Sequence, residues 1–160
     1  MANFQHKTFI KYDDWNTPKY AWEDIIEYIP KDKIIWEAFY GDGKSGDYMK
    51  ELGLNVIHEE IDFFKEDKGD IIISNPPFSL YREILDRLFL LDKPFIIILP
   101  SSKINTQYFR KWKDKGLKII IPKKRIDFSK YDNIKRSNCA FDCFYYCYKI
   151  DLPSSIIWLQ

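Results

Sequence analysis

The sequence predicts an α/β fold with a doubly wound, mostly parallel sheet and an antiparallel C-terminal hairpin. Strand-like and helix-like segments alternate along the chain, and this order is typical of a doubly wound sheet. The isoleucine runs at residues 71–73 and 96–98 are apolar throughout, so we expect both faces of the sheet to be covered. The 160 residues fit one domain, residues 1–160, and no linker or internal repeat indicates a second one.

The composition excludes several classes of protein. Hydrophobic residues make up 46% of the chain and charged residues 31%, which predicts a folded chain rather than a disordered one. The formal charge is +1, so any contact with nucleic acid must come from local basic patches. Because the sequence has no signal peptide and no apolar run of membrane-spanning length, we expect no membrane contact and an intracellular location.

The three cysteines do not predict a metal site. Cys139, Cys143 and Cys147 are spaced by four in a segment rich in Phe and Tyr, which favours a strand. On a strand this spacing keeps one face, so we expect small, buried, apolar side chains. His6 and His58 are isolated in the sequence and complete no set of metal ligands.

The first helix is predicted at residues 20–28, where large apolar residues recur at helical spacing. We expect Thr17 to cap this helix and Pro18 to occupy its first position. Trp15 lies just before the cap, where it would either pack under the helix or border a ligand.

A strand, a glycine turn and a helix follow at residues 33–52, which is the opening unit of a nucleotide-binding α/β fold. Gly41 and Gly43 would let the backbone approach a ligand closely. Gly46 completes the Gly-x-Gly-x-x-Gly spacing of dinucleotide-binding proteins, so a dinucleotide ligand stays open. Glu37 at the strand end instead favours a cofactor that carries a cationic amino group.

Acidic residues follow the second predicted strand, at residues 54–58. An acid in this place commonly binds ribose hydroxyls, and by spacing it would be Glu59 or Glu60, of which we prefer Glu59. Asp62 and Phe63 come next as an acid paired with an aromatic ring. A charged surface loop is the alternative for this stretch.

The third strand, at residues 70–74, runs directly into Asn75, Pro76, Pro77 and Phe78. Proline cannot continue a strand ladder, so the chain must turn at the carboxyl end of the strand, where open α/β sheets bind ligands. The Asn75 amide and the two proline carbonyls could accept hydrogen bonds from an amino group, and the Phe78 ring could stack on another flat ring. The alternative is a proline-rich turn with no further role.

The rest of the chain is expected to form, in order, a helix at 81–90 capped by Ser79, strands at 94–99 and 117–121 around a basic helix at 105–115, a polar loop at 129–138 and a final strand at 141–150. Basic residues in this half are candidate phosphate contacts: Lys103, Arg110, Lys111, Lys113, Lys123, Lys124 and Arg125. A solvated charged face is an equal alternative. Trp112 and the polar loop could hold a displaced base.

Together these motifs resemble those of S-adenosylmethionine-dependent amino-methyltransferases, above all the phage-type adenine-N6 methyltransferases. Asn-Pro-Pro-Phe at 75–78 resembles their catalytic motif, and Glu-x-Phe-x-Gly-x-Gly at 37–43 resembles the first cofactor motif of class I methyltransferases. Trp-x-Thr-Pro at 15–18 and Arg-Ile-x-Phe at 125–128 are weaker matches. The resemblance spans residues 15–148 and implies a Rossmann-like class I methyltransferase fold.

The resemblance implies S-adenosylmethionine as the cofactor and roles for individual residues. Asn75 and the Pro76 carbonyl would accept hydrogen bonds from the two amino hydrogens of the target. Pro77 completes the motif beside them, and Phe78 would stack on the target base. The residues implied in cofactor binding are Trp15, Thr17, Pro18, Glu37, Phe39, Gly41, Gly43, Glu59, Asp62, Phe63 and Asn75.

DNA is the expected substrate, with nucleic acid as the partner. RNA adenine, a protein glutamine amide, and a non-catalytic nucleic-acid-binding subunit are the alternatives. Since no separate target-recognition domain is expected, a homodimer or a partner subunit would supply specificity. The richness in Ile, Lys, Tyr and Asn suggests an AT-rich genome, such as that of a phage or virus.

Overall fold

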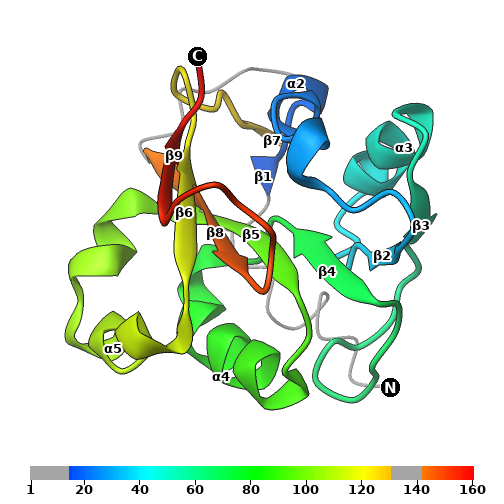
Figure 1. The fold of residues 1–160 in the computed structure, drawn as a ribbon. Coiled ribbons are helices and arrows are strands. Elements are labelled where there is room, and N and C mark those ends of the chain that lie inside the picture. Colours follow the sequence, from blue (N-terminus) through cyan, green and yellow to red (C-terminus); the bar gives the residue numbers. More distant parts are fainter. Residues whose placement is uncertain (1–14, 131–141) are drawn as a thin grey trace.

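The computed structural model describes residues 15–130 and 142–160, and its main sheet has seven strands in the order β3-β2-β4-β5-β8-β6-β9 (Figure 1). The parallel part consists of β3 (Asn55–Ile57), β2 (Ile34–Trp36), β4 (Ile71–Ser74) and β5 (Phe95–Pro100). The strand β8 (Cys143–Tyr148) lies between β5 and β6 (Lys118–Ile121) and is antiparallel to both. The predicted fold class is confirmed, including the antiparallel C-terminal pair.

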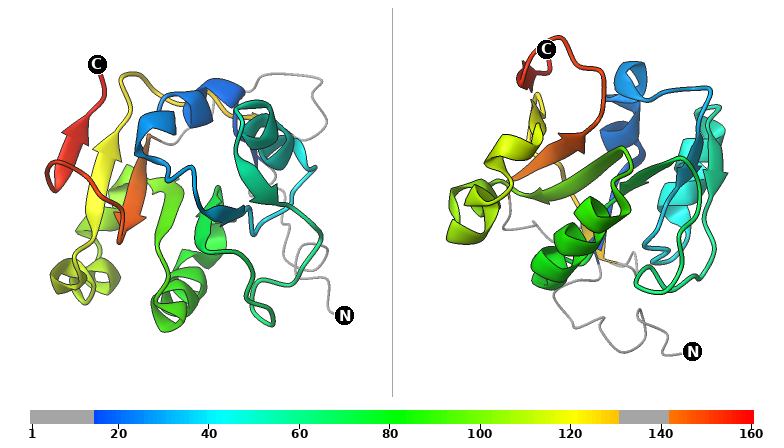
Figure 2. Two further views of the ribbon diagram at one scale, coloured as in Figure 1. Left: turned by 45° about the vertical axis from the view of Figure 1, so that its right-hand side comes forward. Right: turned by 60° about the horizontal axis from the view of Figure 1, so that its bottom comes forward.

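The crossover helices cover both faces of the sheet. α3 (Lys44–Glu51) joins β2 to β3, toward the β3 edge of the sheet. α4 (Tyr81–Leu91) joins β4 to β5 and α5 (Gln107–Arg110) lies between β5 and β6, so both connections run toward the opposite edge. Because parallel crossovers are right-handed, α3 lies on one face and α4 and α5 lie on the other. Figures 1 and 2 show α2 (Lys19–Glu23) beside α3, away from α4 and α5.

The central strands form the middle of the core. Every residue of β4 and β5 is buried, which is why these segments are apolar at successive positions rather than alternating. Trp22 and Trp36 are fully buried, and Cys143 and Cys147 are buried, as their strand spacing predicts. Cys139 lies outside the described residues.

The predicted helix at residues 20–28 is wrong in its length and its cap. α2 ends at Glu23, and a separate 3-10 turn, η1 (Ile26–Tyr28), follows. Ile25 leaves helical geometry with φ −112° and ψ 6°, and its side chain is fully buried, so core packing overrides the helical pattern there. Thr17 does not cap α2, because Pro18 takes the N-cap position in an extended conformation.

Two further helix predictions need correction. The expected helix at 105–115 divides into α5, capped by the Thr106 hydroxyl, and η4 (Lys113–Lys115), with η3 (Ser101–Asn105) before them. Between α5 and η4 the Trp112 ring stacks on Phe89 at a centroid distance of 4.0 Å. Ser79 does not cap α4, since it lies inside η2 (Phe78–Leu80) and Leu80 is the N-cap residue.

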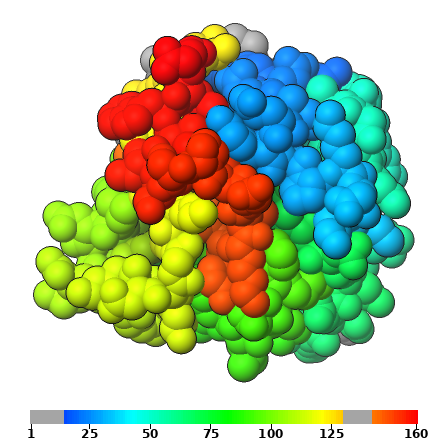
Figure 3. Space-filling model, in the orientation of Figure 1, coloured from blue at the N-terminus to red at the C-terminus, as the bar shows by residue number. Residues whose placement is uncertain are grey.

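Two strand pairings were not predicted. β9 (Ile156–Trp158) adds a parallel edge strand to β6, so the strand at 141–150 is not the last one. β1 (Trp15–Asn16) pairs antiparallel with β7 (Ser129–Lys130) at the start of the predicted polar loop, and residues 131–138 of that loop lie outside the described part. In Figure 3 the C-terminal segment (red) lies beside the segment that holds α2 (blue).

The structure also bears on two predicted absences. Within residues 15–130 and 142–160, no helix is long and apolar enough to cross a membrane. No group of three or more His, Cys, Asp or Glu side chains suited to a metal ion occurs among these same residues.

Candidate functional site

A narrow cleft lies at the carboxyl ends of β2 and β4, where ligands bind in open α/β sheets. It is lined by Trp15, Asn16, Thr17, Glu37, Phe39, Tyr40, Gly41, Asp42, Ser45 and Asn75. Three segments that are far apart in the sequence therefore meet in one place, and six of the residues predicted to bind a cofactor lie in the lining. Asn75 is the one member of the proline motif that lines this cleft.

Glu37 is the buried acid of the cleft, with only 1% of its surface exposed. Its Oε1 atom accepts hydrogen bonds from the Ser74 hydroxyl and from the Phe39 backbone N–H, the latter at 3.2 Å. Burial raises the pKa of Glu37 to about 8, although both hydrogen bonds act in the opposite direction, and the nearby charge of Asp42 raises it further. The carboxyl group is therefore mostly protonated at neutral pH until a cation approaches it.

Asn75 is held at its donor end. Its Nδ2 atom donates to the Trp15 backbone carbonyl at 3.4 Å, and its Oδ1 atom is buried without a partner among the described residues. Pro76 and Pro77 are buried behind it, which limits how the turn can move. The acceptor end of the amide thus remains available to a hydrogen-bond donor that enters the cleft.

Among the buried oxygen atoms of the cleft lining, Thr17 Oγ1, Glu37 Oε2 and Asn75 Oδ1 have no hydrogen-bond partner in the described part of the chain. Buried polar atoms in proteins are nearly always satisfied, and leaving one unpaired costs about 1–3 kcal/mol. Their convergence from β2, β4 and the segment before α2 indicates a site for a ligand that carries hydrogen-bond donors.

In the turn between β2 and α3 and in the first turn of α3, the space beside Gly43 and Gly46 is occupied by the rings of Tyr40 and His58. A Cβ atom on Gly43, where φ is +85°, would lie 2.9 Å from the Tyr40 hydroxyl. One on Gly46 would lie 2.2 Å from the His58 ring, and Tyr40 and His58 stack with their centroids 5.8 Å apart. These two glycines make room for side chains, so the arrangement does not favour the dinucleotide alternative.

Sequence reasoning missed Asp42 and Ser74. Asp42 accepts from Asn16 Nδ2 at 2.8 Å and from the Lys44 backbone N–H at 3.1 Å, so it joins the N-terminal segment to the start of α3. An acid just before a helix is a recognisable capping signal, whereas the bond to Asn16 is a tertiary contact that no local pattern shows. Ser74, fully buried, is visible in the sequence only as the polar end of an apolar strand.

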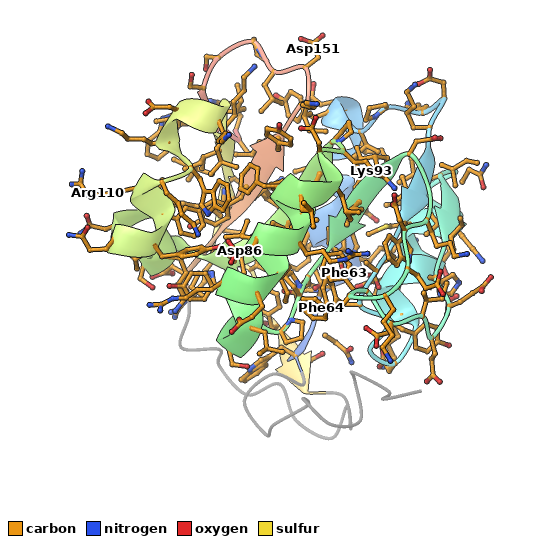
Figure 4. All side chains as sticks on the ribbon, turned by 90° about the horizontal axis from the view of Figure 1, so that it is seen from below. Phe63, Phe64, Asp86, Lys93, Arg110 and Asp151 are labelled. Carbon is orange, nitrogen blue, oxygen red and sulfur yellow. The ribbon has the colours of Figure 1, made fainter. Side chains whose placement is uncertain are left out.

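The predicted ribose and adenine contacts do not line the cleft. Glu59 is exposed, and Asp62 is buried with its Oδ1 atom accepting from the Phe64 backbone N–H at 2.9 Å. Phe63 is fully buried, with centroid distances of 4.8 Å to Phe39 and 5.7 Å to Trp36. Phe63 and Phe64 lie beside α4 in Figure 4, and Phe63 serves as core in this conformation.

Phe78 is also mostly enclosed. Only 8% of its surface is exposed, and its ring meets Phe128 edge-on at a centroid distance of 6.1 Å. The aromatic end of the proline motif is therefore supported by the segment that precedes β7. A stacking role requires an approach to the small exposed part of the ring.

The predicted phosphate contacts fall into two groups. Lys103, Arg110, Lys111 and Lys113 lie on the connection between β5 and β6, whereas residues 123–125 follow β6. In the second group Arg125 pairs with Asp142 at 2.9 Å, and Lys123 with Asp24 at 3.6 Å.

Comparisons with known proteins agree with the resemblance seen in the motifs. Residues 49–118, which include the Asn-Pro-Pro-Phe motif, match the family described as adenine-specific methyltransferase EcoRI. The Type II methyltransferase M.EcoRI of Escherichia coli is 45% identical over 73 residues, which are 46% of this chain and 19% of that protein. The chain thus matches about a fifth of its relative's length.

A solved structure of a candidate RNA methyltransferase from Pyrococcus horikoshii, PH1948, is 15% identical to this chain, with a TM-score of 0.43. That similarity covers 84% of this chain and 81% of the other. The predicted resemblance to adenine-specific methyltransferases is confirmed by the family and sequence matches, and the fold assignment stands on the strand order.

Proposed function

We propose that this chain is an S-adenosylmethionine-dependent methyltransferase that methylates the exocyclic N6 atom of adenine, with DNA as its substrate. The observation that carries the proposal is the cleft in which Thr17 Oγ1, Glu37 Oε2 and Asn75 Oδ1 are buried without partners. The match of residues 49–118 to adenine-specific methyltransferases supports the same assignment.

The cleft suits the amino-acid end of S-adenosylmethionine. Glu37 offers a free carboxylate oxygen to a cationic ammonium group, whose charge would draw the pKa of this acid back down and keep it ionised. Thr17 offers a hydroxyl, and Trp15, Pro18, Phe39, Gly41 and Gly43 lie on or beside the lining. When bound, the cofactor supplies a methyl group made electrophilic by a sulfonium.

The other end of the cofactor is assigned less directly. Glu59 is proposed to bind the ribose hydroxyls, since it is exposed just past the end of β3. Asp62 is proposed for the adenine amino group, with Phe63 behind it as a wall. Neither side chain lines the cleft without the cofactor, so this part of the site would have to adjust when the cofactor binds.

The proline motif would orient the target amine. An aryl amine is a poor nucleophile because its lone pair is delocalised into the ring. Asn75 Oδ1 and the Pro76 carbonyl would each accept a hydrogen bond from one N6 hydrogen. These two bonds would direct the nitrogen lone pair toward the methyl donor. The Trp15 carbonyl holds the Asn75 amide in the required orientation. This is catalysis by position and electrostatics, without a covalent intermediate on the protein.

Recognition of the target needs more than this cleft. In duplex DNA the adenine must be flipped out of the stack, at a cost of roughly a few kcal/mol. Phe78 and Pro77 would border the flipped base. We propose that the chain acts as a single catalytic domain inside the cell, and that a homodimer or a partner subunit supplies sequence specificity. The basic residues on the connection between β5 and β6 (Lys103, Arg110, Lys111 and Lys113) would contact phosphates, whereas Lys123 and Arg125 are paired with carboxylates.

A methyl-transfer assay with radiolabelled S-adenosylmethionine tests the proposal. Unmethylated DNA, RNA and a protein extract are offered in parallel to the purified chain and to Asn75→Ala. We expect label in DNA as N6-methyladenine, and none with the variant. Label in RNA or in protein glutamine would replace the DNA assignment, and label in no substrate together with no cofactor binding would refute the proposal.

A further inference from the structure

A surface built from α4, η3 and α5 interleaves cations with aromatic rings. Its members, here called the cation–aromatic surface, are Tyr81 and Arg82 on α4, Lys103 on η3, Tyr108 on α5, and Lys111 and Trp112 just after α5. Tyr81 is buried beneath Arg82 and Lys103, whereas the rings of Tyr108 and Trp112 are partly exposed. Of these, Lys103 and Lys111 were foreseen as phosphate contacts, whereas Arg82 and the two tyrosines were not.

The cations lie directly over the rings. Lys103 Nζ is 4.5 Å from the centre of the Tyr81 ring, and Arg82 Cζ is 5.7 Å from the ring centres of both Tyr81 and Tyr108. Lys111 Nζ is 4.3 Å from the centre of the Tyr108 ring. The rings therefore fix long, charged side chains in place, which reduces the entropy that a ligand must remove from them.

Positive charge is in excess on this surface. Among the described residues Asp86 pairs with this surface, accepting from Lys111 Nζ at 3.1 Å and from the Tyr108 hydroxyl at 2.6 Å, and Glu83 acts on Arg82 through its charge alone. Neither Arg82 nor Lys103 forms an ion pair with any carboxylate in the described part of the chain. Figure 4 shows Asp86 on α4 next to α5, and Arg110 on the outer side of α5.

The pKa of the Tyr81 hydroxyl reflects the positive charges around it. Burial acts to raise its pKa, yet hydrogen bonds with Arg82 and Thr106 and the charge of Lys103 bring the pKa of Tyr81 below its ordinary value. An anionic group is therefore favoured at this point of the surface.

The surface begins where the reaction would take place. Tyr81 follows Asn75 by six residues, separated from it by the proline turn and η2. Lys103 follows the end of β5 by three residues, at the same carboxyl edge of the sheet as the cleft. A strand whose target base enters the cleft would pass next to these two side chains.

We propose that the cation–aromatic surface binds unpaired nucleotides that flank the target adenine, with Arg82 and Lys103 contacting their phosphates. The inference rests on the proposed function for the location of the target base. Alternating phosphates and flat bases are the ligand that cations and aromatic side chains fit together. The basic run at 123–125 is assigned no part, because Lys123 and Arg125 already have carboxylate partners.

Fluorescence anisotropy with labelled oligonucleotides tests this proposal on the full chain. The probes are a single strand with one adenine, a hairpin with an unpaired adenine, and a continuous duplex. The variants are Arg82→Gln and Lys103→Met, which remove charge and keep the aliphatic stem over the ring. Lys123→Met combined with Lys124→Met is the matched control, and each protein's melting temperature is measured to confirm folding.

We expect each surface variant to weaken binding of the single strand and the hairpin about tenfold and to lower the salt slope by about one. The control should bind as the unchanged chain does. Unchanged binding by Arg82→Gln and Lys103→Met, or no nucleic-acid binding by the unchanged chain, would overturn the proposal. Cofactor affinity is measured alongside by calorimetry and methyl transfer by the radiolabel assay. Loss of nucleic-acid binding with both of these retained would then overturn this inference alone, whereas loss of cofactor binding would overturn the proposed function.

Discussion

Buried polar groups in two parts of the main sheet, β8 and the carboxyl ends of β2 and β4, differ in their hydrogen bonding. In β8 the buried tyrosines are satisfied, since the hydroxyl of Tyr145 donates to the Ala21 carbonyl at 2.7 Å and that of Tyr146 to the Pro100 carbonyl at 2.9 Å. At the carboxyl ends of β2 and β4, Glu37 and Asn75 each bury an oxygen without a partner. The first region satisfies its buried polar groups by itself, whereas the second leaves two buried oxygens unpaired within the described residues.

This difference separates stability from function. The tyrosine hydroxyls of β8 connect the antiparallel strand to the segment of α2 and to the end of β5, so their loss should affect folding. The unpaired oxygens of the cleft contribute little to the fold or weaken it, so their loss should affect binding and chemistry. Each prediction below tests one side of this comparison.

The largest effect is expected from Asn75→Ala. Removing the amide acceptor should lower methyl transfer about 100- to 1000-fold, because the target amine loses its orientation. Cofactor affinity should stay within a few-fold, as measured by calorimetry. Asn55→Ala, at an exposed position of β3, is the control. Loss of transfer and cofactor affinity together would mean a folding defect or a wrong site.

A second prediction concerns the pH dependence of stability. The folded-state pKa of Glu37 is raised to about 8 from an ordinary value of 4.5, so the folded state holds a proton that the unfolded chain releases. This contribution to stability is fully present below pH 4.5 and is lost as pH rises through 8, on the order of 5 kcal/mol in all. Glu37→Gln should remove it.

Urea unfolding of both proteins between pH 4 and 9 measures the effect. The difference in unfolding free energy between Glu37→Gln and the unchanged chain should grow with pH in favour of the variant. Other titrating groups are shared by the two proteins and cancel in this difference. If the unfolding free energies of the two proteins changed with pH in parallel, the pKa of Glu37 would be the same in the folded and unfolded states, which would contradict the prediction.

A third, smaller effect is expected from Tyr145→Phe. The substitution leaves the Ala21 carbonyl buried without its donor, which should cost about 1–3 kcal/mol of unfolding free energy. The melting temperature should fall, while methyl transfer measured well below it should not change. A variant that keeps its stability and loses activity would reverse the roles that we assign to the two regions.

The smallest effect is expected from Thr17→Val. This nearly isosteric change removes a buried hydroxyl that has no partner, so stability should stay equal or rise by less than about 1 kcal/mol. Cofactor affinity should fall a few-fold, because the cleft loses one hydrogen-bonding group. Chemical denaturation and calorimetry on the same preparation check both parts, and a clear loss of stability would show that the hydroxyl has a structural partner.

The sequence predicted the central part of the fold well because that part is determined locally. The runs that became β4 and β5 are apolar at every position, and their ends are marked by proline. Glu37 and Asn75 were predicted at strand ends, and parallel strands bring such ends to one edge of the sheet. Their meeting in one cleft follows from the strand order.

The sequence failed where tertiary contacts decide. β1 and β7 are two residues long and pair across more than one hundred positions, so no local pattern marks them. Helical spacing continued past Glu23, but burial of Ile25 ended the helix there. Phe63 has its ring fully buried in the core, and its predicted contact with a ligand stays a prediction.

The most direct test of the central claim is a calorimetric titration of S-adenosylmethionine into the unchanged chain and into a double variant, Thr17→Val with Glu37→Gln. If the unpaired oxygens form the cofactor site, the unchanged chain binds and the double variant loses at least about tenfold in affinity, or 1.4 kcal/mol, while remaining folded. Equal affinity in the two proteins would show that the cofactor binds elsewhere and would contradict the account.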